Sequence, residues 1–196
     1  MRYFLLGVFL IPLTVSGQDS GQLSLNAYFD AYYSTYTDDL PLNEFQKFTT
    51  VSPRDNQIGI NAAQLGLAYT NDWVRGAFTL HYGDIAKATW DPDFQAVQEA
   101  WAGIKVLENV WVDAGFFPTH VGTESFLPKN NMLSSTTVAT YIGPFYQGGA
   151  RVSWTGSERL SASFHVVNGY NQFLDRNRAK SYGILVSYQF NEALTL

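Results

Sequence analysis

The chain has 196 residues, of which 46% are hydrophobic, 16% are aromatic and only 15% are charged. Typical soluble proteins carry about 25% charged residues, so this surface cannot be strongly charged. The net charge of -5, without any run of Lys or Arg, argues against a nucleic-acid partner, because phosphate binding needs a concentrated basic surface. The lack of cysteine excludes disulfides, thiolate metal sites, cysteine nucleophiles and anchoring through a lipidated cysteine.

Residues 1–17 are typical of a secretory signal peptide. A single basic residue, Arg2, precedes an apolar stretch that is too short to span a bilayer as a helix, and the small residues Ser16 and Gly17 follow it. We expect the mature chain to begin near Gln18. No later stretch reaches ~18 consecutive apolar residues, so insertion into a membrane would require a closed barrel of strands.

Extended segments follow in which hydrophobic side chains occupy every second position. They are residues 23–35, 58–69, 74–82, 98–106, 110–116, 146–154, 160–166 and 182–190. In the second segment the alternation changes phase between Ala62 and Ala63, which predicts a β-bulge there. We therefore predict an all-β fold, an antiparallel up-and-down transmembrane β-barrel of at least eight strands.

Charged side chains provide an independent indication of which face of these segments meets water. Within the segments, the charged residues and histidines all lie on the polar face. They are Asp30, Arg75, His81, Glu99, Lys105, Asp113, Arg151 and His165. An Arg or Lys that faces lipid near the bilayer midplane costs about 2–4 kcal/mol, so this distribution is typical of a membrane barrel, and we predict that these residues line a pore.

The connectors separate a membrane barrel from a soluble sandwich, since both architectures share the alternating pattern. Long polar links (37–57, 84–96, 118–145 and 169–180) alternate with tight ones (70–72, 107–109, 155–158 and 191–193). Short periplasmic turns and longer external loops are typical of outer-membrane barrels. Aromatic residues at strand ends predict two interfacial girdles: Tyr33, Tyr82, Phe116, Tyr146 and Tyr182 on the external side, and Tyr69, Trp154 and Phe190 on the periplasmic side.

Several short motifs resemble those of the OmpL-like β-barrel porins of Gram-negative outer membranes. They are residues 64–69, 74–76, 97–100, 111–122 and 167–169, and the most specific run is 113–124, where a strand ends in Phe-Phe-Pro-x-His-x-Gly-x-Glu. The resemblance implies an outer-membrane location and permeability to solutes. Outer-membrane barrels usually end on a strand with a terminal aromatic residue, whereas here a ninth strand begins at residues 194–196. We therefore expect residues 18–196 to be the N-terminal portion of a C-terminally truncated barrel.

The function that we expect is passive diffusion of small hydrophilic solutes or ions, with outer-membrane lipid and these solutes as partners, and with no cofactor, metal or enzymatic activity. The inner charges could order water in a channel, or pair across neighbouring strands at about 0.2–1 kcal/mol per pair. The link after Pro118 is longer than structureless loops usually are. We expect it to form a constriction with His120, Glu124 and Lys129.

Three alternative functions remain open. The spacing of His120 and Glu124 would allow a metal site or an acid–base pair, although hydrogen bonds that fasten a loop to the barrel wall are the simpler interpretation. A plugged structural or adhesive barrel could bind partners through links such as 38–56. An outer-membrane enzyme is less favoured, because no nucleophile motif accompanies the histidines. A homo-oligomer is also left open.

Overall fold

The computed structural model describes residues 21–37, 40–47, 51–191 and 194–195, so the predicted signal peptide lies outside the described residues. One antiparallel sheet contains all the strands in sequence order. They are β1 (Gln22–Ser34), β2 (Gln57–Thr70), β3 (Val74–Tyr82), β4 (Val97–Leu107), β5 (Val110–Pro118), β6 (Tyr146–Ser157), β7 (Leu160–Val167), β8 (Ser181–Asn191) and the short β9 (Leu194–Thr195). The predicted all-β, up-and-down antiparallel fold is confirmed.

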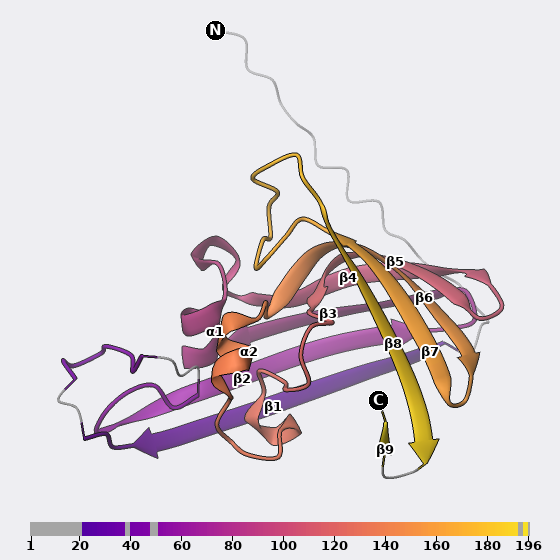
Figure 1. Ribbon diagram of the computed structural model, residues 1–196. Coiled ribbons are helices and arrows are strands. Elements are labelled where there is room, and N and C mark those ends of the chain that lie inside the picture. The colour runs from indigo at the N-terminus through magenta and orange to yellow at the C-terminus, as the bar shows by residue number, and fades with distance from the viewer. Residues whose placement is uncertain (1–20, 38–39, 48–50, 192–193, 196) are drawn as a thin grey trace, which may run out of the picture.

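The sheet is curved but open (Figure 1). Each strand pairs with its neighbours in the chain, and within the described parts of the chain no strand pairs with the free edge of β1. This arrangement is consistent with an incomplete barrel. The ninth strand predicted at the end of the chain is present as β9, which pairs with β8.

The predicted bulge in β2 is present one residue before its expected place. Asp30 of β1 pairs with Ala62, whereas the next residue, Ala31, pairs with Ile60. Asn61 is therefore the extra residue. The bulge reverses which positions of β2 face outward, so that one face stays apolar along the whole strand.

The outer face of the sheet is an apolar surface. Its exposed large side chains include Leu23, Leu25, Phe29, Ile58, Leu65, Leu67, Phe78, Leu80, Ile104, Val152, Phe164, Ile184 and Val186. Soluble monomers rarely expose contiguous apolar patches larger than a few hundred Å². An apolar face that extends over neighbouring strands instead suits contact with acyl chains.

The aromatic girdles are only partly as predicted. Tyr33, Tyr82, Tyr182, Tyr69, Trp154 and Phe190 are exposed, as expected for the outer face. Phe116 and Tyr146, however, are buried, with 4% and 1% of their surfaces exposed, and they pack in an apolar cluster formed with the long links. The prediction was wrong for these two residues, because link residues cover them. Gly115, directly before Phe116, has a φ of 137°, so the strand is not regular there.

The long links lie at one end of the sheet and the tight turns at the other. The long links contain the short helices α1 (Asp84–Thr89) and α2 (Val138–Ile142) and the 3-10 turns Pro92–Phe94 and Pro128–Asn130. The link that contains α2 lies on the inner side of the curved sheet (Figure 1). Among the described residues, no helix has both the length and the apolar character needed to cross a membrane.

The contrast between the two faces of β8 predicts the effect of a charge placed on the face that would meet lipid. Val186 is exposed on the outer face and its neighbour Ser187 points inward. In lipid vesicles, Val186→Arg should lower the free energy of unfolding by about 2–4 kcal/mol, because the guanidinium would meet acyl chains. Ser187→Arg is the matched control and should cost much less. Equal effects of the two substitutions in denaturant titrations would contradict a lipid-facing outer surface.

Candidate functional site

An apolar cluster covers the inner face at the end where the long links lie. Its buried members are Val51, Ala62, Ile85, Trp90, Phe116, Phe126, Leu127, Phe145 and Tyr146, and most of them belong to links rather than strands. Trp90 is central, since its ring lies 5.1 Å from Phe126 and 5.0 Å from Tyr146 between centroids. The Tyr146 hydroxyl accepts a hydrogen bond from the backbone N–H of Asp91 at 3.0 Å. The links therefore supply a hydrophobic core that a single sheet cannot form alone.

The link between β5 and β6 crosses the inner face. At its start, the His120 ring stacks on His165 of β7 with centroids 3.9 Å apart, and its Nδ1 lies 2.9 Å from Oε1 of Gln147. The same ring lies over Gly183 of β8, where it occupies the place that a Cβ would take. Farther along, the Lys129 ammonium lies 4.6 Å from the ring of Tyr28 on β1. This link therefore contacts both β8 and β1.

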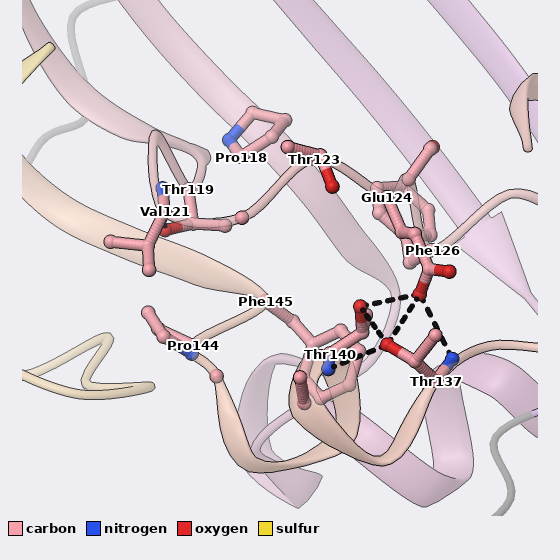
Figure 2. A pocket seen from close by; sticks show the side chains of 14 residues that line it. Pro118, Thr119, Val121, Thr123, Glu124, Phe126, Thr137, Thr140, Pro144 and Phe145 are labelled. Carbon is pink, nitrogen blue, oxygen red and sulfur yellow. Dashed lines mark hydrogen bonds between the residues drawn. The ribbon is translucent and has the colours of Figure 1, made fainter.

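Glu124 stabilises the conformation of the same link through hydrogen bonds to other residues of that link. Figure 2 shows its carboxylate directed at Thr137 and Thr140, at the start of α2. Oε2 of Glu124 accepts hydrogen bonds from the Thr140 hydroxyl at 2.6 Å, the Thr137 N–H at 2.9 Å and the Thr137 hydroxyl at 3.0 Å. These bonds, first that of the Thr140 hydroxyl, hold the pKa of Glu124 below its ordinary value. Glu124, Thr137, Thr140 and neighbouring residues of the link line a cavity of about 470 Å³.

His120 and Glu124 thus form separate contacts. One faces Gln147 and His165, and the other faces the two threonines. Within the described ranges, no group of three or more His, Asp or Glu side chains is placed to hold a metal ion. The geometry supports the interpretation that each of these residues fastens the link.

A lateral row of paired residues crosses the inner face from β3 to β8. Its members, each paired in register with the next, are Arg75, Gly103, Asp113, Arg151, His165 and Gly183. Asp113 is fully buried and accepts hydrogen bonds from Nε and Nη2 of Arg75 at 2.7 and 2.6 Å and from Nε of Arg151 at 2.7 Å. Gly103 lies between Arg75 and Asp113, and the Asp113 carboxylate occupies the space above it.

Two tryptophans lie beside this ion pair network. The Arg75 guanidinium lies 4.6 Å from the ring centroid of Trp111, and the Lys105 ammonium lies 6.0 Å from the same centroid. The Arg151 guanidinium lies 4.8 Å from the ring of Trp101. Such contacts stabilise cations by about 0.5–2 kcal/mol each. Three of the predicted cations and one carboxylate therefore gather in a single patch.

The other predicted residues lie nearer the long links. Glu99 accepts hydrogen bonds from the Thr79 hydroxyl at 2.8 Å and from Nε1 of Trp101 at 2.9 Å. Asp30 accepts one from the side-chain amide of the bulge residue Asn61 at 3.2 Å.

His81 is buried beneath Trp90, with ring centroids 4.6 Å apart, and its Nε2 has no hydrogen-bond partner among the described residues. Asp113 and His165 are likewise buried. These three residues lie on the inner side of the sheet, where neighbouring side chains cover them, and their predicted role in lining a pore stays a prediction.

A second ion pair network, which the sequence did not predict, lies among the long links. Asp84 at the start of α1 is buried and accepts two hydrogen bonds from Arg54, from Nε at 2.8 Å and from Nη2 at 2.9 Å. The Tyr32 hydroxyl donates a third at 2.7 Å. These bonds fasten the link between β1 and β2 to α1. No strand periodicity covers Arg54 or Asp84, so only the folded links bring them together.

The close approach at Gly103 generates a test of the central ion pair. A Cβ at this position would collide with the Asp113 carboxylate, so Gly103→Ala should displace it from Arg75. We expect the free energy of unfolding to fall by about 1–3 kcal/mol, as for other overpacked sites. Gly143→Ala is the matched control, because a Cβ there meets its nearest atoms at 3.5 Å, an ordinary contact. Equal stabilities in denaturant unfolding would show that the ion pair does not depend on the glycine.

The Glu124 contacts predict a pH dependence of the link. The fold favours the ionised carboxylate, so its stabilisation is complete above the ordinary Glu pKa and is lost as the pH falls through the lowered pKa. The hydrogen-exchange protection of the Thr137 amide should therefore fall on acidification. In Glu124→Gln this pH dependence should disappear, whereas in Glu158→Gln, in an exposed turn, it should persist. Equal pH dependence of this protection in Glu124→Gln and in the unchanged protein would refute this role for Glu124.

The comparisons with known proteins agree with the geometry of the sheet. The sequence profile of one family, described as putative beta-barrel porin-2, OmpL-like, matches residues 22–196. A search of the curated proteins and a search of the solved structures give no match. The matched range begins at the first residue of β1 and includes every strand of the sheet. The chain therefore belongs to the OmpL-like family of β-barrel porins.

Proposed function

We propose that the protein is a porin-like channel of the outer membrane, exported through the signal peptide of residues 1–17, for passive diffusion of small hydrophilic solutes or ions. The proposal rests on the contrast in polarity between the two faces of the sheet. The outer face is apolar and exposed, and the inner face holds Arg75, Lys105 and Arg151, which remain partly exposed. A wall with these faces suits lipid outside and water inside. Porin-like proteins are in general not enzymes, and we assign no catalytic step.

The link between β5 and β6 is the constriction of this channel. His120 fastens its start to β7 and β8, Lys129 lies against β1, and Glu124 joins the first part of the link to Thr137 and Thr140 at the start of α2. A segment that lies across the inner face narrows the space left for solutes. Its contacts on opposite parts of the sheet support a fixed position rather than a freely moving loop.

A plugged structural or adhesive barrel is the second candidate. The observation in its favour is the apolar cluster around Trp90, because buried aromatic side chains on the inner face leave no path for water where they pack. The cationic patch favours the channel instead, because a lumen filled for structural reasons alone would not need a third cation, Lys105, beside two arginines that already share one carboxylate.

Ion conductance distinguishes the two candidates. The full-length protein, reconstituted in planar lipid bilayers, should give stepwise ion currents, whereas a plugged barrel would give none. Deleting residues 125–137 should raise the single-channel conductance, because it removes the middle of the constriction. Deleting residues 174–179, an exposed part of the link before β8, is the control and should leave the conductance near that of the unchanged protein. Correctly folded protein without current would refute the channel function, and an unchanged conductance after the first deletion would refute the constriction.

A further inference from the structure

We propose that the inner wall carries a binding site for small anions, with carboxylate or phosphate groups, formed by Arg75, Lys105 and Arg151 beside Trp101 and Trp111. The inference rests on the proposed channel function and adds the class of solute. The three cationic side chains come from β3, β4 and β6, and the strand pairing brings them to one patch of the inner face.

The patch keeps an excess of positive charge. Asp113 is the only carboxylate that forms an ion pair with these three cations among the described residues, and it contacts both arginines. The ammonium of Lys105 forms no ion pair or hydrogen bond in the described part of the chain, and it lies 6.0 Å from the ring centroid of Trp111. Glu99 lies beyond Trp101, toward the long links, and lies within 4.0 Å of no Lys or Arg nitrogen there. Even with Glu99 counted, the patch remains positive.

Hydrogen-bond donors without a protein partner also favour an anion site. Arg151 donates to Asp113 only through Nε, so both of its terminal nitrogens lack a hydrogen-bond partner among the described residues. Its side chain is 22% exposed and that of Arg75 is 25% exposed, so both reach the space in front of the wall. The buried Asp113 holds the two guanidinium groups on either side of one carboxylate and fixes their positions. The donors are therefore oriented before any solute arrives.

The chemistry of these donors selects an anion. A guanidinium presents paired N–H groups that match the oxygens of a carboxylate or phosphate, and a Lys ammonium adds a mobile point charge. Rings of Arg and Lys are the usual lining of pores that conduct anions or phosphate. Trp101 and Trp111 cover one side of the cations and limit their hydration, which strengthens their field. A solute that carries one anionic group would therefore pause at this patch.

Reversal potentials in a potassium chloride gradient test the charge preference. The unchanged full-length protein should be more permeable to chloride than to potassium. Lys105→Gln and Arg151→Gln should each shift the permeability ratio toward unity, whereas Arg178→Gln, which removes the same charge from the exposed link before β8, should leave it unchanged. Lys105 does not contact Asp113, so Lys105→Gln still decides the question if Arg151→Gln fails to fold. A ratio that neither variant shifts would overturn the proposal.

Inorganic phosphate tests binding directly. Added to chloride solutions at constant ionic strength, it should reduce the chloride current with a saturable dependence on concentration. In Arg151→Gln the half-effective concentration should rise about tenfold, as expected for the loss of one charge-assisted hydrogen bond. Acetate, which carries a carboxylate, should reduce the chloride current in the same saturable way. A current that phosphate does not reduce, in channels that conduct normally, would refute the anion site alone, whereas the absence of any current would refute the channel function itself.

Discussion

The side chains of a β-strand point alternately to the two faces of the sheet. In this chain, that alternation separates apolar from charged side chains, and most of the structure depends on this separation. One face carries large apolar residues that stay exposed over neighbouring strands. The other face must then hold every charge that the strands contain. Those charges that are buried against the wall are stable only if they find partners. The buried Asp113 between Arg75 and Arg151 is the main result of that requirement.

Glycine makes these lateral contacts possible. Arg75 on β3 and Asp113 on β5 are separated by a whole strand, and they meet because Gly103 of β4 leaves the space between them empty. Gly183 of β8 does the same for His120, whose ring lies over it and stacks on His165. In both cases the missing side chain lets a polar group reach across the wall. The glycines are therefore part of the polar network rather than breaks in the strands.

The long links replace the second layer that a single sheet lacks. Trp90, Phe126 and Phe145 come from two different links and pack with Tyr146 on the inner side of the wall. The Arg54 and Asp84 pair ties a third segment to α1. This construction leaves the cationic patch nearer the tight turns, away from the apolar cluster. The inner face is thus divided into a packed end and a charged end.

The sequence alone determined the strands, their order and which face of each is apolar, because these properties depend on local alternation and on the lengths of the connectors. It also assigned Arg75, Lys105, Asp113 and Arg151 to the inner wall, and it indicated the bulge within one residue of Asn61. Only the tertiary structure decided which of these charges meet, because register between strands and the empty space at Gly103 are not visible in one strand's pattern. It also decided that Phe116 and Tyr146 turn into a core and that Asp84 pairs with Arg54. Those contacts join segments far apart in the chain, where no periodicity relates one residue to another.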